Sequence, residues 1–354
     1  MSATPVVFDV ATAEQGVSEM LRGAALSLHA LGRPLELHLV VYDIEEAQQL
    51  AELELAAAAR QHGVVVEFHR AHDRLPANVE SPVRVYRTYP GNPINTAVRL
   101  AKELQGVVIS PGNTGLVMTC ALFEFGRVPG VERPPIATPW PTLRETMFAL
   151  DSGANVDLRP HHLLEFAHIG KVYVERIFGR KNPRVGLLSN GSEEYKGNAL
   201  VKEAHRLLTK DSAINYVGYI EGQNFFAGEA DLLLMDGFVG NILLKFGEGL
   251  AATVYRVLRE EIRANLLAAI SAKLFMTSSL RRFKKRFDYA EWGGAPLLGV
   301  KGNVVISHGR SDAAAVKNAI RWAVRMAEER IAERIEQELL ESGLAATEDS
   351  GRSA

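Results

Sequence analysis

Short apolar runs alternate along this chain with longer segments whose apolar residues recur every three or four positions. The run from Pro5 to Val10 predicts a strand, and the segment from Gly16 to Leu31 predicts a helix with one apolar face. The same alternation predicts a strand over Leu35 to Tyr42, a helix over Glu45 to His62 and a strand over Val64 to His69. Strands that alternate with helices pair in parallel through right-handed crossovers, so the pattern predicts an α/β protein.

Two segments depart from this simple alternation. Residues His72 to Asn95 contain several prolines and are predicted to form an exposed excursion with little regular structure, before a helix resumes over Thr96 to Leu104. Near the other end, the spacing predicts one long helix from about Ser311 to Glu341, with Ser311 or Asp312 as the N-cap candidate. The polar residues 345–354 are predicted to form a disordered tail.

Five times, a strand-like run breaks into a loop rich in glycine and asparagine and then into a helix. The five stretches are VVISPGNTG (107–115), FALDSGAN (148–155), VGLLSNGSEEYKGN (185–198), LLLMDGFVGN (232–241) and VVISHGRSD (304–312). The first N–H groups of a helix have no partners within it and lie at the positive end of its dipole, which suits an anion. In open parallel sheets such loops gather at the carboxyl ends of the strands. Together they predict a site for a phosphate or a similarly charged group.

The segment from Val254 to Trp292 has a different character. Apolar residues recur every four positions from Leu258 to Leu274, which predicts an amphipathic helix, and a basic stretch with two phenylalanines follows. We predict a protruding helical hairpin over 254–292 whose second arm contacts a membrane or a carrier protein through Arg281, Arg282, Phe283, Lys284, Lys285 and Phe287. Three interpretations stay open: packing within the hairpin or on a second subunit, contact with anionic lipid, and docking of an acidic protein.

The bulk composition is that of an ordinary globular protein. The chain has 354 residues, 47% hydrophobic and 23% charged, and a formal net charge of −2, which gives no reason to expect nucleic-acid binding. Its length predicts two lobes, which we place in one domain over 1–344. The single cysteine, Cys120, rules out an internal disulfide and is expected to be a buried core thiol. We see no signal peptide and no apolar run long enough to span a membrane, so we predict a cytoplasmic protein.

The motifs become specific enough between residues 110 and 320 to indicate a family. They are SPGNTG, LDSGANVD, PRVGLLSNGSEEYKGN, IEG at 220–222, DGFVGNILLKFGEGLA, WGGAPLLGVKG and ISHGRSDAAAVKNAI. In this order and spacing they closely resemble the bacterial phosphate acyltransferases of phospholipid synthesis. Those enzymes move a long acyl chain from acyl carrier protein to inorganic phosphate and so produce acyl phosphate.

The resemblance implies more than an activity. It implies a Rossmann-like, three-layer α/β/α fold with a mostly parallel sheet, shared with isocitrate and isopropylmalate dehydrogenases and with phosphotransacetylases. It also implies a homodimer, no organic cofactor, and an amphipathic hairpin that contacts the membrane peripherally.

The N-terminal third departs from the family pattern. The family's first strand ends in Asp-Ala-Met-Gly-Gly-Asp, of which this chain keeps only Asp9. Further on, Thr88 and Tyr89 replace two lysines, and Asn92 and Pro93 replace two serines. Lysine is not interchangeable with threonine or tyrosine at an anion site, so the chain is a divergent member by this comparison.

Acyl transfer to phosphate requires that phosphate be held, that the thioester carbonyl be polarised and that water be kept out. No protein nucleophile is required, because phosphate itself attacks. We assign phosphate and substrate binding to Gly112, Asn113, Thr114, Gly115, Asn155, Asn198, Gly240 and Asn241. The catalytic candidates are Lys245 and Lys196 for charge neutralisation, Asp236 for orientation and His308 for donation to the oxyanion.

Plainer roles compete with each assignment. Lys245 is also consistent with an ordinary surface lysine, Asp236 and Asn198 with capping of the following helices, and His308 with a structural histidine. No metal site is predicted, because His161 and His162 are adjacent on a predicted helix and should point apart.

Two other functions remain open. A metal- and nicotinamide-dependent dehydrogenase of the shared fold is disfavoured, since no aspartate cluster and no Gly-x-Gly-x-x-G motif is present. A catalytically silent, membrane-associated partner of acyl carrier protein or of a downstream acyltransferase would explain the changes at Thr88 and Tyr89. The intact DGFVGN and GGAPLLG loops favour the enzyme.

Overall fold

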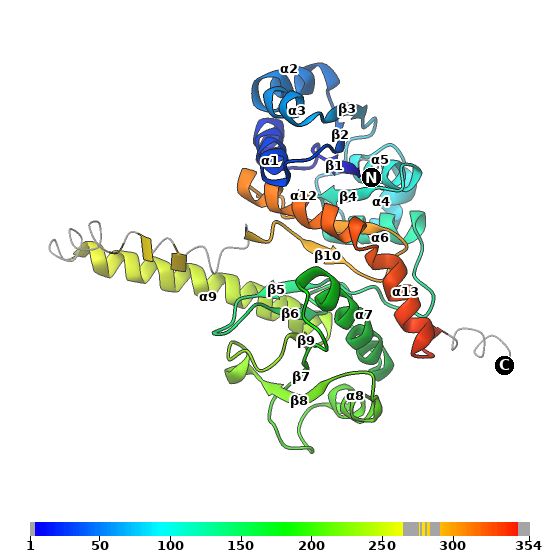
Figure 1. Ribbon diagram of the computed structural model, residues 1–354, viewed down its shortest axis with the longest axis vertical. Coiled ribbons are helices and arrows are strands. Elements are labelled where there is room, and N and C mark those ends of the chain that lie inside the picture. The colour runs from blue at the N-terminus through cyan, green and yellow to red at the C-terminus, as the bar shows by residue number, and fades with distance from the viewer. Residues whose placement is uncertain (1–3, 265–275, 277, 280–281, 284–290, 346–354) are drawn as a thin grey trace.

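Two β-sheets organise the protein into two lobes (Figure 1). The computed structural model describes residues 4–264, 276, 278–279, 282–283 and 291–345. The sheet of the first lobe has the strand order β10 (Ala295–Leu297), β11 (Asn303–Ile306), β4 (Val107–Ser110), β1 (Pro5–Asp9), β2 (Glu36–Val41) and β3 (Val65–Arg70). The sheet of the second lobe has the order β5 (Thr138–Trp140), β6 (Met147–Leu150), β9 (Leu232–Leu234), β7 (Val185–Ser189) and β8 (Tyr216–Glu221).

Most strand pairs are parallel, as the alternation of strands and helices predicted. Only the edge strands β10 and β5 run antiparallel to their neighbours, β11 and β6. All other pairs in the two sheets are parallel. The predicted α/β class with a mostly parallel sheet is therefore confirmed, while the boundary of a single domain at residue 344 stays a prediction.

Helices cover both faces of each sheet. In the first lobe, one face packs against α1 (Gly16–Leu31), α2 (Ile44–Glu54), α3 (Ala56–His62) and α12 (Ala313–Glu328), and the other against α4 (Pro82–Thr88), α5 (Pro93–Glu103) and α6 (Thr114–Glu124). In the second lobe, α7 (Pro160–Phe178), α8 (Ala199–Lys210) and α13 (Ile331–Glu341) cover one face, and α9 (Gly237–Ala264) and the short helix η1 (Gly222–Asn224) lie on the other. This is the three-layer arrangement that the resemblance implied.

The strand residues supply both layers of core because alternate side chains point to opposite faces. Val6 and Phe8 of β1 belong to one buried cluster and Val7 to the other. The first cluster is continuous through both lobes, since it also contains Phe148 of β6 and Phe166 of α7.

Two predicted helices are in fact broken. The helix expected over Glu45 to His62 is interrupted at Leu55, which is 1% exposed and separates α2 from α3. The helix expected over Ser311 to Glu341 breaks at Arg330, whose backbone is left-handed. Because the helix breaks here, its two parts pack on different lobes: α12 packs against α1 in the first lobe, and α13 packs against α7 in the second.

The prediction of an irregular excursion between His72 and Asn95 was wrong in its second half. Pro82 and Pro93 occupy the first turns of α4 and α5, where the missing N–H of proline costs nothing. Asn92 caps α5 by accepting hydrogen bonds from the N–H groups of Ile94 and Asn95. The departures from the family pattern at Asn92 and Pro93 therefore form a helix start.

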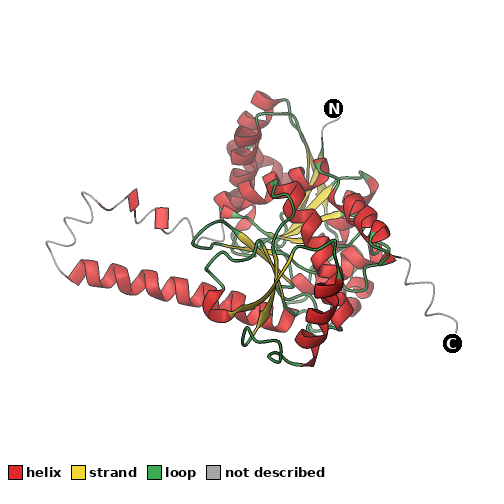
Figure 2. Ribbon diagram, turned by 60° about the horizontal axis from the view of Figure 1, so that its bottom comes forward, coloured by secondary structure: helices red, strands yellow, loops and turns green. Residues whose placement is uncertain are grey.

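Helix α9 extends well beyond the body of the second lobe (Figures 1 and 2). Its residues 254–264 belong to the predicted hairpin, but most of that hairpin lies outside the described residues, including Arg281, Lys284, Lys285 and Phe287. Arg282 and Phe283 are described and exposed. None of the helices in the described part of the chain is long and apolar enough to cross a membrane.

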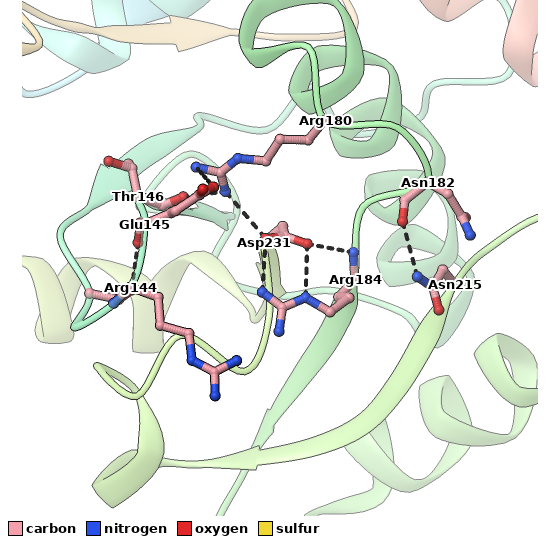
Figure 3. A network of polar contacts seen from close by, with 9 residues as sticks. Arg144, Glu145, Thr146, Arg180, Asn182, Arg184, Asn215 and Asp231 are labelled. Carbon is pink, nitrogen blue, oxygen red and sulfur yellow. Dashed lines mark hydrogen bonds and ion pairs between the residues drawn. The ribbon is translucent and has the colours of Figure 1, made fainter.

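An ion-pair network ties the second sheet together at the end opposite its loops (Figure 3). Asp231 precedes β9, and its two carboxylate oxygens accept hydrogen bonds of 3.0 and 3.1 Å from the guanidinium of Arg184, which precedes β7. Arg180, just after α7, approaches the same carboxylate at 3.3 Å and donates to the carbonyl of Thr146. The pKa of Asp231 lies below its ordinary value. Burial alone would raise it, but the hydrogen bonds from Arg184 and the charge of Arg180 outweigh the effect of burial.

Candidate functional site

A cleft of about 720 Å³ lies over the carboxyl ends of strands in the first lobe. Two of the five predicted loops form part of it: the SPGNTG loop after β4 and the SHGRSD loop after β11. The remaining wall comes from the ends of β1 and β2 and from the segment after β3. The lining residues are Thr12, Glu14, Tyr42, Leu75–Glu80, Pro111–Thr114 and Ser307–Gly309.

A buried carboxylate holds the SPGNTG loop in place. Asp9 is 0% exposed, and its Oδ2 accepts hydrogen bonds from the hydroxyls of Ser110, at 2.7 Å, and Thr12, at 2.6 Å. Ser110 Oγ accepts in turn from the N–H of Gly112 at 3.1 Å. Burial raises the pKa of Asp9 to about 6, and the hydrogen bonds from Thr12 and Ser110 oppose that rise. The carboxylate therefore positions the loop from beneath.

The LDSGAN loop after β6 is organised by a second buried carboxylate. Asp151 accepts hydrogen bonds from the N–H groups of Ile136, Ala154 and Asn155 and from the side chain of Asn155. Burial raises the pKa of Asp151, although these hydrogen bonds oppose the shift. The loop packs on the start of α9, where Gly240 approaches so closely that a Cβ there would lie 1.9 Å from the Asp151 carbonyl oxygen.

The predicted phosphate-binding residues divide between the two lobes. Gly112, Asn113 and Thr114 line the cleft in the first lobe, next to Gly115 at the start of α6. Asn155, Gly240 and Asn241 lie together in the second lobe, where a Cβ on Gly153 would contact Asn241. The two groups belong to different sheets.

The candidate catalytic residues are more scattered. His308 is exposed and lines the cleft, with its Nδ1 accepting from the N–H of Arg310. Asp236 caps α9 by accepting from the N–H of Val239, and Asn198 caps α8 in the same way. The capping role left open for both residues is therefore present in the structure.

The two lysines lie on separate elements of the second lobe. Lys245 is exposed on α9. Lys196 lies in the loop after β7, with its ammonium 5.4 Å from the ring centre of Tyr195. Their roles at the site stay predictions.

The expectation that His161 and His162 point apart was wrong. Glu132 Oε2 lies 3.3 Å from His161 Nε2 and 2.9 Å from His162 Nε2, because the loop carrying Glu132 passes the start of α7 and meets both rings. His162 Nδ1 accepts a hydrogen bond from the N–H of Arg159, so its proton is on Nε2 and is donated to Glu132. This tautomer leaves His162 Nε2 without a free lone pair for a metal.

Several residues that shape the site were not assigned a role at the site from the sequence. Asp9, Ser110 and Asp151 stand at the carboxyl ends of strands, and this position was the available signal. The segment Leu75–Glu80 gave no signal, because its approach to the cleft depends on the sheet order and not on any local pattern.

The fold is one that solved phosphotransacylases share. The structure is similar to a phosphotransacetylase from Streptococcus pyogenes (TM-score 0.59, 17% identity, 92% of this chain and 94% of that chain). It is also similar to a branched-chain phosphotransacylase from Enterococcus faecalis (TM-score 0.57, 15% identity, 92% and 99% of the two chains). At these identities the likeness establishes the fold.

The sequence establishes the family. The chain belongs to the family described as fatty acid synthesis protein, whose sequence model matches residues 5–334. It is 41% identical over 331 residues to the phosphate acyltransferase of Pelotomaculum thermopropionicum, covering 93% of each chain. It is 40% identical over 338 residues to the phosphate acyltransferase of Geobacter sulfurreducens, covering 94% of each. The resemblance drawn from the motifs is therefore confirmed.

Proposed function

We propose that this protein is a phosphate acyltransferase that transfers a long-chain acyl group from acyl carrier protein to inorganic phosphate for phospholipid synthesis. The observation that carries the proposal is the likeness to phosphate acyltransferases over more than nine-tenths of the chain. The phosphotransacylase fold supports it independently, since that fold is shared by proteins named for acyl transfer to phosphate. Family membership also favours the transferase over the dehydrogenase.

In the proposed reaction, a phosphate oxygen attacks the thioester carbonyl. The carbon–sulfur bond breaks, the acyl–oxygen–phosphorus linkage forms, and the carrier thiol leaves with a proton. A protein nucleophile is unnecessary, and the one cysteine is poorly suited to that role. Cys120 is 0% exposed and its Sγ donates to Asn95 Oδ1 at 2.7 Å, while burial raises the pKa of the thiol well above its ordinary value.

We assign phosphate binding to the loop of Gly112, Asn113, Thr114 and Gly115 and to Asn155, Asn198, Gly240 and Asn241. Lys245 and Lys196 supply positive charge, Asp236 orients them, and His308 donates to the carbonyl oxygen. The Asp9–Ser110–Gly112 hydrogen bonds support the first loop as a preformed cradle, because they fix the turn before any ligand arrives; the Gly112 N–H is itself occupied in this contact.

The test is direct detection of acyl phosphate. The full chain, palmitoyl-loaded acyl carrier protein and inorganic phosphate would be mixed, and the product trapped as its hydroxamate. We expect phosphate-dependent turnover that Lys245→Ala abolishes and that Lys210→Ala, at an exposed lysine of α8, leaves unchanged. Absence of turnover while the carrier protein still binds would contradict the enzyme and favour the silent binding partner.

We further propose a homodimer built on α9. Its outer face exposes an apolar stripe at three- and four-residue spacing, formed by Phe238, Ile242, Phe246, Leu250, Val254 and Val257. A stripe of this length on a projecting helix fits a second copy of the same helix. Light scattering should give a dimer for the parent chain and a monomer for Ile242→Glu/Phe246→Glu, with Glu248→Gln as the control.

Peripheral membrane contact is assigned to the basic segment that follows α9. Flotation with anionic and with neutral liposomes tests it, and we expect Lys284→Glu/Lys285→Glu to lose binding to the anionic vesicles. Unchanged binding by that variant would rule out these lysines as the lipid contact.

A further inference from the structure

A group of two histidines and one glutamate lies on the first sheet, at the paired strands β2 and β3. In the parallel register, His38 is opposite Glu67 and Val40 is opposite His69. Because side chains alternate along a strand, His38, Glu67 and His69 all project from the same face. The group is thus held by regular backbone.

The three potential ligand atoms are spaced like the corners of a metal coordination shell. His38 Nδ1 lies 3.1 Å from His69 Nε2 and 3.5 Å from Glu67 Oε2, and the last two atoms are 3.8 Å apart. Ligands bound tetrahedrally to zinc at about 2.0–2.2 Å are roughly 3.3–3.6 Å from one another. The observed separations therefore need adjustments of only a few tenths of an ångström.

The accessibility of the three residues also suits an ion that enters from solvent. The side chain of His38 is 6% exposed, that of His69 28% and that of Glu67 55%. His38 is enclosed by its neighbours, while the exposed side chain of Glu67 can change rotamer to complete the coordination of an ion. Two imidazoles and a carboxylate form the donor set found in three-ligand zinc sites that keep a fourth position open.

A second group of two histidines and one glutamate lies among the described residues, but it is less suited to bind a metal ion. Glu132, His161 and His162 also converge. There, however, His162 Nδ1 accepts from the N–H of Arg159, so Nε2 carries the proton and has no lone pair to give. His38 Nδ1 and His69 Nε2 share a hydrogen bond of 3.1 Å, but no backbone hydrogen bond fixes which ring carries that proton among the contacts that the structure describes, so a metal ion can replace it.

We propose that His38, Glu67 and His69 bind a divalent transition-metal ion such as Zn²⁺, which clamps the edge strand β3 onto β2. The chain passes from β3 through Ala71, whose N–H donates to the carbonyl of Val41, and then forms the cleft wall at Leu75–Glu80. The ion therefore stabilises the end of β3, from which the segment Leu75–Glu80 continues. It lies outside the predicted phosphate-binding residues and takes no part in the acyl transfer.

The surroundings of His38 set an expectation for the affinity. Its Nε2 is buried without a hydrogen-bond partner in the described part of the chain. Metal-bound histidines usually donate their second N–H to an acceptor, and loss of such an acceptor costs about 10–100-fold in affinity. We therefore expect the metal affinity of this site to be about 10–100-fold lower than that of a site whose histidines all donate their second N–H to an acceptor.

Metal titration of the full chain tests the proposal. After chelator treatment and desalting, Zn²⁺ binding would be measured by calorimetry, Co²⁺ absorption would report the coordination geometry, and thermal unfolding would be followed with and without Zn²⁺. We expect one ion per chain, a tetrahedral Co²⁺ spectrum and a higher Tm with Zn²⁺. Glu67→Gln and His69→Gln should each weaken binding about tenfold or more and remove the Tm shift.

The matched controls are Glu132→Gln and His161→Gln, which alter the other convergent group and should leave binding and the Tm shift unchanged. Circular dichroism of each metal-free variant would confirm that it folds; the buried His38 is left intact for this reason. The proposal is overturned if no saturable site is found, if the Glu132 or His161 variant loses binding instead, or if Glu67→Gln and His69→Gln bind like the parent.

Discussion

The carboxylate of Asp9 accepts a hydrogen bond of 2.7 Å from the hydroxyl of Ser110, and the two residues end the neighbouring parallel strands β1 and β4. Through Ser110 Oγ, this contact reaches the N–H of Gly112 in the predicted phosphate loop. The geometry of the loop thus depends on an acid more than a hundred positions earlier in the chain.

The first prediction concerns the pH dependence that this buried acid gives to stability. The folded-state pKa of Asp9 is about 6, above its ordinary 3.8, so the folded protein binds the proton more tightly than the unfolded chain. Stability therefore falls as pH rises through that window. Asp9→Asn removes the titration, so its free energy of unfolding relative to the parent should increase by about 2 kcal/mol from about pH 4.5 to 7.5.

Urea unfolding of the two proteins at both pH values measures this difference. Glu14→Gln, at an exposed acid of the same cleft, is the control and should show no such trend. A difference between parent and Asp9→Asn that stays constant with pH would show that Asp9 does not titrate in this window.

The second prediction uses two glycines of α9. At Gly240 a Cβ would lie 1.9 Å from the carbonyl oxygen of Asp151, and backbone cannot move aside cheaply. At Gly249 a Cβ would meet nothing within 4 Å. Gly240→Ala should therefore lower the free energy of unfolding by about 2 kcal/mol or more and impair phosphate-dependent turnover, while Gly249→Ala should stabilise by up to about 1 kcal/mol.

Thermal unfolding and the acyl phosphate assay distinguish the two variants. If Gly240→Ala were as stable and active as Gly249→Ala, the close packing of α9 on the loop after β6 would be refuted.

The secondary structure was predictable from the chain wherever the pattern was local. The strand that begins at Pro5 and the helix from Gly16 to Leu31 follow from hydrophobic spacing alone. The break at Arg330 could not be predicted, because it arises from two lobes that α12 and α13 contact separately. Pro82 and Pro93 led to the wrong prediction for this segment, since proline breaks the interior of a helix but is favoured in its first turn.

The loops of the candidate site could be predicted from the sequence, but the way they are placed relative to one another could not. Glycine and asparagine after a strand indicated the turns that carry Asn113 and Asn155. Their separation between two sheets depends on the strand order, which no local pattern encodes. The same limit applies to Glu132, which reaches His161 and His162 only through tertiary contact.

The third prediction concerns the network around Asp231. Asp231→Asn keeps the shape of the side chain but removes the charge that faces Arg180 and Arg184. Arg184 then loses its counter-ion and Arg180 keeps only the exposed Glu145, so the free energy of unfolding should fall by about 1–3 kcal/mol. Because the network lies at the opposite end of the strands from the loops, KM for phosphate should stay within about twofold of the parent value.

Chemical denaturation together with steady-state kinetics separates these effects. The exposed Asp157 provides the control, as Asp157→Asn should change neither quantity. A large rise in KM with unchanged stability would mean that Asp231 acts on the site and not on the sheet.

The last prediction concerns a buried histidine of the second lobe, which lies between α7, α8 and α13. His168 of α7 is 0% exposed; its Nδ1 lies 2.9 Å from Glu338 of α13, and its Nε2 lies 2.9 Å from Asp211 after α8. Each ring nitrogen therefore lies within hydrogen-bonding distance of a carboxylate. The hydrogen bond from His168, with further help from Lys171, lowers the pKa of Glu338 to about 2 against the effect of burial.

A depressed carboxyl pKa stabilises the fold above the unfolded value of 4.5, and this stabilisation is lost as pH falls from there towards about 2. Glu338→Gln should therefore lower the free energy of unfolding at neutral pH by about 1–2 kcal/mol, a value reduced for the partial exposure of the carboxylate. The difference from the parent should shrink below about pH 4.5, opposite in sign to the trend for Asp9. Glu341→Gln, at an exposed acid of the same helix, should show neither effect. A Glu338→Gln difference that persists unchanged down to pH 3 would mean that packing, and not the contacts of the carboxylate with His168 and Lys171, accounts for the loss.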